Sequence, residues 1–116
     1  MTVNEMVEEL NGLNEKDYVA TKIFFNKEEG CRGGGVVNTF IDGDLRMSSN
    51  DRFDDDCGFT VRMLLDELSK MDASDDDVYL SYGDDFNHVG AYLEKIERSK
   101  RKSNVVELVG YTSHKY

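Results

Sequence analysis

Hydrophobic positions along the chain form two stretches with the spacing of an amphipathic helix. The apolar residues of the first stretch are Val3, Met6, Val7, Leu10 and Leu13, and those of the second are Val61, Leu64, Leu65, Leu68 and Met71. Intervals of three and four residues place each set on one face of a helix. Thr2 and Thr60 precede the stretches, and a threonine hydroxyl caps a helix by accepting a hydrogen bond from a backbone N–H. The pattern predicts helices that stop near Asn14 and Asp72.

The two helical stretches also match residue by residue at an offset of 58 positions. Thr2-Val3 corresponds to Thr60-Val61, Glu9-Leu10 corresponds to Glu67-Leu68, and the residues between them keep their apolar phase. Because period and phase agree together, the match predicts an internal duplication. The two repeats would span approximately residues 1–58 and 59–116.

Runs of aromatic and β-branched residues follow each helix and predict strands. Tyr18–Phe25 comes after the first helix and Val78–Tyr82 after the second. Four further strands are predicted in two hairpins, the first around Asp42-Gly43, at Val36–Ile41, Leu45–Met47, Val89–Arg98 and Val105–Tyr111. A short helix over Tyr92–Ile96 is an alternative for part of the third of these.

These elements predict an α+β protein in which residues 1–116 form a single domain. It would consist of two pseudo-repeated αβββ units, each with its helix packed on antiparallel strands. A chain of 116 residues buries enough surface for one modest core, so we expect the two units to share it. The Asp-rich segment Ser48–Gly58 would connect them.

The charge of the chain narrows the class of partner. Twenty-four acidic and fourteen basic residues give a formal net charge of −10. Such a surface repels DNA and anionic lipid and attracts a basic protein surface. The aspartates that we expect to contact such a partner are Asp51, Asp54, Asp55, Asp56, Asp75, Asp76, Asp77, Asp84 and Asp85. A basic run provides candidate RNA contacts at Arg98, Lys100, Arg101 and Lys102.

The sequence contains no motif that predicts catalysis, a metal or a cofactor. Neither aspartate triplet supplies the complete ligand pattern of a calcium loop, and no residues form a recognisable catalytic triad. Gly33-Gly34-Gly35 precedes a strand rather than a helix, so we expect a flexible loop and not a phosphate-binding loop. Cys31 and Cys57 have no nearby Cys or His, so no zinc site is predicted. The lack of an export signal predicts a reducing compartment and free thiols, with a disulfide between the two cysteines as the alternative.

The motif Thr60-Val61-x-x-Leu64-Leu65-x-x-Leu68, followed by Asp75 and Val78-Tyr79-Leu80, resembles small acidic proteins of bacteriophages and other mobile elements. The chain differs from their usual pattern in lacking a proline after the helix. In size, charge and absence of catalytic motifs it is similar in type to anti-CRISPR proteins. The resemblance implies a host-interaction protein of the bacterial cytoplasm, since no membrane span or secretory leader is predicted.

Three hypotheses follow for function. The first is a phage-encoded inhibitor whose carboxylates replace phosphates on a basic surface of a defence nuclease, such as an RNA-guided nuclease. The second is a non-catalytic structural or regulatory module that forms a homodimer through β-edges. The third is a metal-dependent nuclease that uses Asp84, Asp85 and His88.

Overall fold

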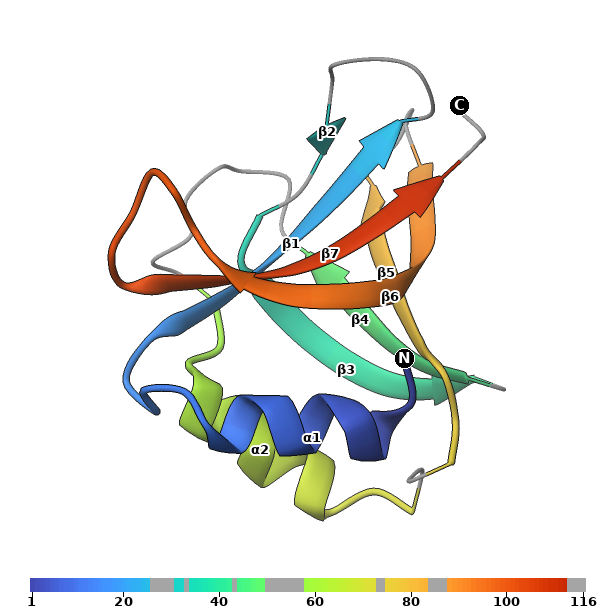
Figure 1. Cartoon of the computed structure of the whole chain (residues 1–116). Helices are drawn as coiled ribbons and strands as arrows, with labels where there is room; N and C mark the ends of the chain where they lie inside the picture. The colour runs from blue at the N-terminus through green and yellow to red at the C-terminus, as the bar shows by residue number, and fades with distance from the viewer. Residues whose placement is uncertain are drawn as a thin grey trace.

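Two short helices pack against a curled sheet in the computed structural model (Figure 1). The structure describes residues 1–25, 31–32, 34–42, 44–49, 58–72, 75–83 and 88–112. The helices are α1 (Val3–Asn11) and α2 (Val61–Ser69). The strands are β1 (Tyr18–Phe25), β2 (Cys31–Arg32), β3 (Val36–Asp42), β4 (Asp44–Ser49), β5 (Val78–Gly83), β6 (His88–Arg98) and β7 (Val105–Thr112). The predicted α+β class is confirmed.

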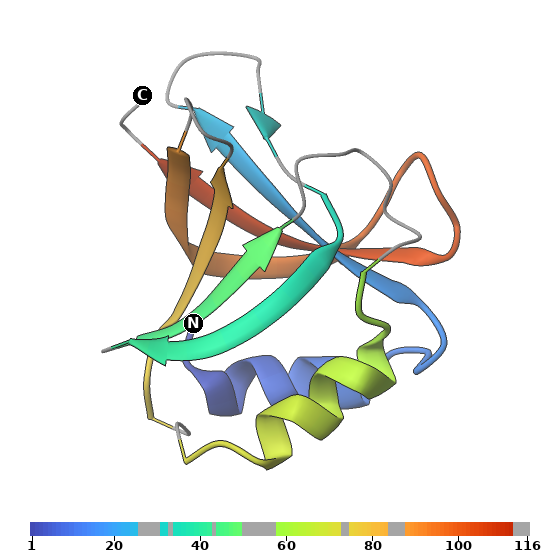
Figure 2. The ribbon, with the colours of Figure 1, turned by 180° about the vertical axis from the view of Figure 1, so that it is seen from behind.

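All of these strands belong to one mixed sheet in the order β2-β1-β7-β6-β5-β4-β3. The sheet curls into a half-barrel, and the two helices lie side by side across one end of it (Figures 1 and 2). The predicted hairpins β3–β4 and β6–β7 are present and antiparallel. The alternative of a helix over Tyr92–Ile96 is wrong, because this segment lies within β6.

The expectation that the strands would all be antiparallel is also wrong. β1 runs parallel to β7, and β5 runs parallel to β4. In both cases the first strand of one half lies beside the last strand of the other half. Parallel pairing therefore joins the two halves, which a sequence pattern cannot reveal because it does not specify partners.

Gly34 and Gly35, which precede β3, form close backbone contacts. They are not part of a flexible loop, contrary to the sequence prediction. Gly34 and Gly35 are buried, and the Gly34 carbonyl oxygen accepts a hydrogen bond of 2.9 Å from the Thr21 N–H. Gly35 forms a bridge with Ala20. A Cβ atom added to Gly58 would lie 2.9 Å from the Gly35 Cα. Glycine is needed here because two backbones approach more closely than side chains allow.

Both helices begin where the sequence predicts and end three residues early. The Thr2 hydroxyl accepts a bond from the Glu5 N–H, and the Glu5 carboxylate accepts one from the Thr2 N–H, which completes a capping box. Hydrogen bonds from Thr2 lower the pKa of the Glu5 carboxyl, and the bond from the Thr2 backbone N–H has the largest effect. The Thr60 hydroxyl accepts from the Met63 N–H at 3.2 Å. The last apolar residue of each stripe follows the helix in a tight turn.

One hydrophobic core contains residues from both halves of the chain. The apolar stripes of α1 and α2 supply Val3, Met6, Leu10, Val61, Leu64 and Leu68, all of which are buried. The inward-facing residues of the strands complete it, among them Val19, Ile23, Leu45, Met47, Val78, Leu80, Leu93 and Leu108. The core thus lies between the helices and the concave face of the sheet.

Matching backbone hydrogen bonds connect the two halves. The Val3 N–H donates to the Asp76 carbonyl oxygen at 2.9 Å, and the Val61 N–H donates to that of Asp17 at 2.8 Å. In a second pair, the N–H groups of Val78 and Val19 donate to the carbonyl oxygens of Met1 and Phe59, at 3.0 and 2.8 Å. Each helix start is therefore anchored to the segment before the first strand of the other half.

Candidate functional site

The aspartates Asp75, Asp76 and Asp77 lie beside the start of α1. Asp75 and Asp77 are exposed and Asp76 is half-buried. Asp77 forms a bridge with Thr2, and the Asp76 carbonyl oxygen accepts from the first N–H of the helix. Negative charge is favourable near a helix N-terminus, which carries a partial positive charge. These aspartates thus have a structural role, and their exposed carboxylates are also available to a partner.

The remaining predicted aspartates lie outside the described residues. These are Asp51, Asp54, Asp55, Asp56, Asp84 and Asp85. The side chain of His88, which the nuclease hypothesis uses, lies outside the described part of the structure as well. Cys57 and the Cys31 side chain are likewise not described.

The basic run forms a tight turn between β6 and β7. The Ser99 hydroxyl oxygen accepts hydrogen bonds of 3.2 Å from the N–H groups of Arg101 and Lys102. The Arg98 guanidinium donates to the Ser103 carbonyl oxygen at 2.6 Å and lies 3.1 Å from the buried Asp17 carboxylate. Arg98 therefore holds the turn in place.

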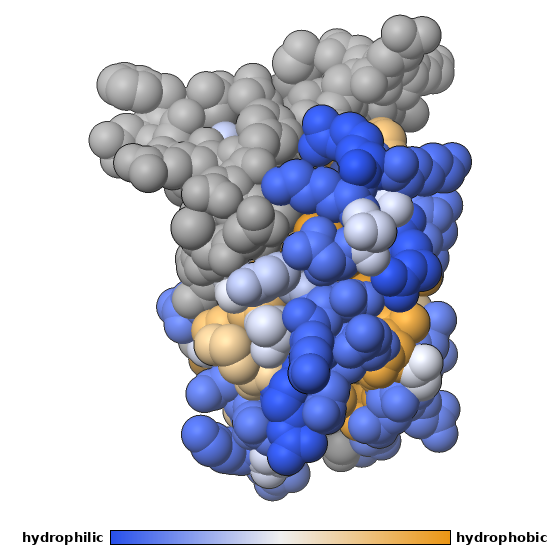
Figure 3. Space-filling view, turned by 90° about the vertical axis from the view of Figure 1, so that its left-hand side faces the viewer, coloured by the Kyte–Doolittle hydropathy of each residue, from blue (hydrophilic) through white to orange (hydrophobic). Residues whose placement is uncertain are grey.

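The side chains of Lys100 and Arg101 are exposed at the tip of this turn. Figure 3 views the molecule from the side on which the turn projects in Figure 1. The described residues on this face are mainly hydrophilic, with hydrophobic patches near the level of the helices. The predicted RNA contacts are thus accessible at Lys100 and Arg101.

Charge is strongly segregated between the layers of the fold. Residues 1–17 and 58–77, which contain both helices and are called the helix layer below, carry eleven acids and three bases, a formal net charge of −8. The strands and the turn 99–104 carry five acids and eight bases, a formal net charge of +3. The strands by themselves carry five acids and five bases, so the positive excess lies in the turn 99–104, and the segments outside these two groups carry the remaining charge of −5.

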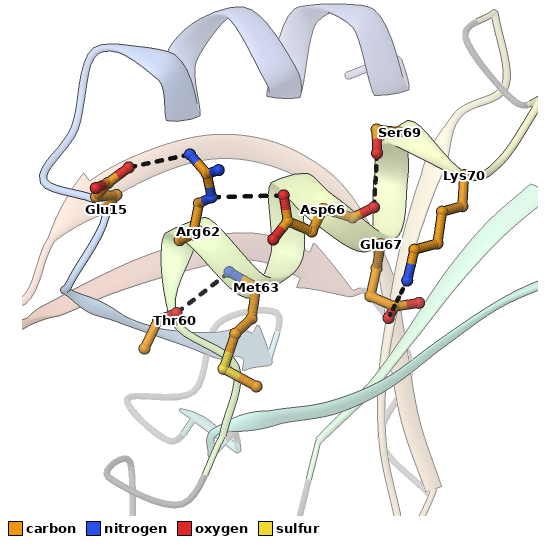
Figure 4. A network of polar contacts seen from close by, with 8 residues as sticks. All are labelled: Glu15, Thr60, Arg62, Met63, Asp66, Glu67, Ser69 and Lys70. Atoms are coloured by element: carbon orange, nitrogen blue, oxygen red, sulfur yellow. Dashed lines mark hydrogen bonds and ion pairs between the residues drawn. The ribbon is translucent and has the colours of Figure 1, made fainter.

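Two of the three bases in the helix layer are bound to its own carboxylates (Figure 4). Arg62 reaches from α2 to Glu15 at 3.4 Å and to Asp66 at 3.5 Å. Lys70 lies 3.6 Å from Glu67. These bases neutralise acids within the layer and leave others in excess. The exposed acids that form no ion pair with a described residue include Glu8, Glu9, Asp72, Asp75 and Asp77.

The outer face of the sheet carries aromatic side chains from four neighbouring strands. Phe24 of β1 is in register with Tyr111 of β7, and their rings stack with centroids 5.4 Å apart. Tyr79 of β5 is in register with Tyr92 of β6, with ring centroids 5.2 Å apart at an edge-on angle of 80°. We call these four residues the aromatic row.

The two ring pairs of the aromatic row are adjacent across the β6–β7 junction. Leu93 pairs with Gly110, so Tyr92 and Tyr111 lie next to each other one position further along the two strands. Both rings are 49% exposed. A Cβ atom added to Gly90 would lie 2.0 Å from the Tyr79 hydroxyl oxygen, so the Tyr79 ring lies over Gly90. The four residues therefore lie in one line across the sheet.

Cationic side chains lie close to rings of the aromatic row. Lys22 lies 5.4 Å from the Phe24 ring centre, Lys95 lies 6.0 Å from that of Tyr111, and Arg46 lies 4.8 Å from that of Tyr79. A hydrogen bond with Tyr111 raises the pKa of Lys95. A cation close to an aromatic face is attracted by its negative quadrupole. The outer face thus combines exposed rings with cations, of which Lys22 and Lys95 are ion-paired with Glu107 and Glu97.

The sequence pattern contained a signal for this surface. Residues at alternate positions of a strand face the same side of a sheet. Lys22 and Phe24 alternate with the buried Thr21 and Ile23, and so belong to the solvent face. Aromatic residues favour strands whether they are buried or exposed, so their type does not reveal their exposure. Their adjacency depends on strand order.

A shallow apolar pocket of about 250 Å³ lies between the two helices. Its lining residues are Val3, Asn4, Val7, Leu65, Leu68, Ser69 and Met71. Val7 and Leu65 occupy equivalent positions of the two apolar stripes and are half-buried. None of these described lining residues is charged.

Within the described residues, no group of three or more His, Cys, Asp or Glu side chains is arranged to hold a metal ion. Neither described helix is long and apolar enough to cross a membrane. Comparisons of the chain with protein-family models, with curated proteins and with solved structures found no match.

Proposed function

We propose that this protein is a phage-encoded inhibitor that binds, through its acidic surface, a basic nucleic-acid-binding surface of a bacterial defence nuclease in the host cytoplasm. Its action is anti-CRISPR-like and non-catalytic: carboxylates occupy the positions that phosphates of a nucleic acid would otherwise take. The observation that supports this proposal is the net charge of −8 on the helix layer.

The arrangement of this layer suits recognition by charge. Its acids lie on two neighbouring helices and on the segment that enters β5, so they form a surface rather than a single point. Fixed carboxylates on a folded scaffold bind without the entropy cost of ordering a flexible acidic tail. Long-range attraction between opposite charges also accelerates association.

We further propose that the two halves arose by internal duplication. The matched hydrogen bonds at Val3 and Val61, and the matched caps at Thr2 and Thr60, support this origin. Duplication would place two equivalent acidic helices side by side. A partner with a long basic channel would then contact both.

The proposal is tested by capture from a bacterial host that contains an RNA-guided nuclease. We expect the wild-type chain to retain the nuclease and to inhibit its cleavage of target DNA. Replacing Asp75, Asp76 and Asp77 together by Asn should weaken binding and reduce its salt dependence, because fewer ion contacts form. The same replacement at Asp54, Asp55 and Asp56 should act in the same direction.

The matched control is Glu94→Gln, which removes an exposed carboxylate from the sheet and leaves the helix layer intact. This variant should bind like the wild type. Affinity that is unchanged between low and high salt would refute phosphate replacement. Equal loss of binding in the control and in the triple variant would refute the helix layer as the contact surface.

A further inference from the structure

We propose that the outer face of the sheet binds single-stranded nucleic acid, with bases stacked on the aromatic row and phosphates held by Lys22, Lys95 and Arg46. This activity belongs to the face opposite the core and does not depend on the helix layer. It would give the protein a second binding surface in addition to its acidic one.

The spacing of the aromatic row suits an extended strand of nucleotides. Neighbouring strands lie about 4.8 Å apart, so four strands span about 14 Å across the sheet. Along this line stand four rings, of which Tyr92 and Tyr111 are each 49% exposed. Aromatic side chains on a sheet bind single strands because every base offers a stacking face. In a duplex those faces are already stacked on neighbouring bases.

The two lysines beside the row are ion-paired, and the pairs differ in their exposure to solvent. Lys22 lies 3.7 Å from Glu107 and Lys95 lies 3.4 Å from Glu97. Both separations exceed the 2.7–2.9 Å of a strong charged hydrogen bond. The Lys95 side chain is 50% exposed, and exposed ion pairs contribute little to stability. The Lys95 ammonium group can therefore turn from its carboxylate to a phosphate at small cost, whereas Lys22, whose partner Glu107 is 8% exposed, would contact a phosphate while it keeps its ion pair.

The acidic helix layer does not prevent this binding. Fields of exposed charges are screened over about 8 Å at physiological ionic strength, whereas the molecule extends 24 to 33 Å along its principal axes. The helices lie across one end of the half-barrel and do not cover the outer face of the sheet (Figures 1 and 2). The charge near the ligand is therefore that of the strands, which carry five acids and five bases and are formally neutral.

The proposal also explains the basic turn. Lys100 and Arg101 are exposed where β6 joins β7, at the opposite end of these strands from the aromatic row. Six residues of β7, from Val105 to Gly110, separate the turn from Tyr111, a length of about 20 Å in an extended strand. A nucleic acid that leaves the row along β7 would reach these two cations.

Fluorescence anisotropy with labelled oligo-uridine and oligo-thymidine of about 12 nucleotides tests the proposal. We expect both probes to bind the wild-type chain at low salt, and a duplex of equal length to bind about tenfold more weakly. Tyr92→Ala and Tyr111→Ala should each weaken binding of the single strands about tenfold, as expected for the loss of one stacked base. Tyr92→Phe keeps the ring and should bind within about twofold of the wild type.

Ile41→Ala and Met63→Ala are the matched controls, because these side chains are 49% and 48% exposed and lie outside the row. They should leave affinity unchanged. Replacing Lys22 and Lys95 together by Gln should reduce the slope of log K against log salt by about 1.4. Far-ultraviolet circular dichroism and thermal unfolding check that each variant is folded.

Three results would overturn the proposal. One is absence of binding of either oligonucleotide at low salt, and another is equal affinity of the ring variants and the two controls. The third is a dimer, detected by light scattering, that Tyr92→Ala dissociates while oligonucleotide affinity stays constant, since the row would then be a self-association surface. Replacement of Asp75, Asp76 and Asp77 by Asn should not weaken oligonucleotide binding, so this test and that of the inhibitor function can fail separately.

Discussion

Tyr92 of β6 is exposed, yet its hydroxyl group is held by β4, which lies two strands away across β5. It donates a hydrogen bond of 2.8 Å to the Asp44 carboxylate, and this bond, together with the charge of Asp44, raises the pKa of Tyr92. Loss of the phenol proton would place two negative charges side by side. The contact therefore fixes the orientation of one ring of the aromatic row while the ring stays accessible.

The pKa of Tyr92 should fall toward its ordinary value in Asp44→Asn, because the carboxylate charge is removed. Phenolate absorbance during an alkaline titration measures this change, and Tyr92→Phe identifies which of the tyrosine transitions belongs to residue 92. Since the folded-state pKa is raised, the contact stabilises the fold below the unfolded-state pKa and is lost as pH rises through the folded-state pKa. An unchanged titration in Asp44→Asn would show that the bond does not form in solution.

A single residue also explains why β6 was ambiguous in the sequence. The register with β7 shifts between Leu93 and Lys95, which leaves Glu94 as an extra residue in the strand. Leu93 and Ile96 consequently both face the core, three positions apart, because their partners are Gly110 and Leu108. This spacing imitates a helix. Periodicity alone cannot separate a bulged strand from one helical turn.

The helices were the most predictable elements, since their caps and apolar stripes depend on local sequence. Their early ends were not predictable. The N–H groups of Leu13 and Met71 donate to the carbonyl oxygens of Leu10 and Leu68, three residues before them. These tight turns bring the last apolar residue of each stripe to the core without another helical turn. The spacing of apolar residues is the same in a tight turn and in a further helical turn, so it does not show where each helix ends.

The two caps differ in one residue, and this difference can be tested. Glu5 completes the capping box of α1, whereas Met63 occupies the equivalent position of α2 and is 48% exposed. Met63→Glu should stabilise the protein by about 0.5 kcal/mol, because a carboxylate would then accept the Thr60 N–H and lie near the positive end of the helix.

Chemical denaturation at neutral pH measures the effect. Thr60→Ala should by itself cost about 1 kcal/mol, since the hydroxyl bond to Met63 N–H is lost. Met63→Gln keeps a reciprocal acceptor without charge and separates the hydrogen bond from the helix-dipole contribution. Destabilisation by Met63→Glu in the wild-type background would mean that repulsion from Asp66 and Glu67 exceeds the capping gain.

Pairing between the halves is the part of the architecture that the sequence could not predict. Local patterns indicated the strands around Tyr18–Phe25 and Val105–Thr112 but not that they lie side by side and parallel. The aromatic row was hidden for the same reason, because Phe24 and Tyr111 become neighbours through this pairing. The segregation of charge was likewise not predictable, because it depends on which elements pack together. Only the sum of −10 is evident from the sequence.

Neither half should fold alone. A chain of residues 1–57 has no partner for the inner edges of β1 and β4, and a chain of residues 58–116 lacks those of β5 and β7. We expect each fragment to show little secondary structure by circular dichroism and no cooperative unfolding, and an equimolar mixture to regain both. Cooperative unfolding of either fragment by itself would show that the halves are independent units.

The parallel pair β1·β7 also sets the order of events while the chain is being made. Tyr18 pairs with Val105, so β1 leaves the ribosome long before its neighbour has been synthesised. Through that interval the edge of β1 that faces β7 has no partner, and an unpaired edge of an apolar strand is prone to aggregate or to attract a chaperone. Contacts this distant in sequence slow the search for the native state. In a cell, the yield of folded protein would therefore depend on chaperone supply as well as on the final stability of the fold.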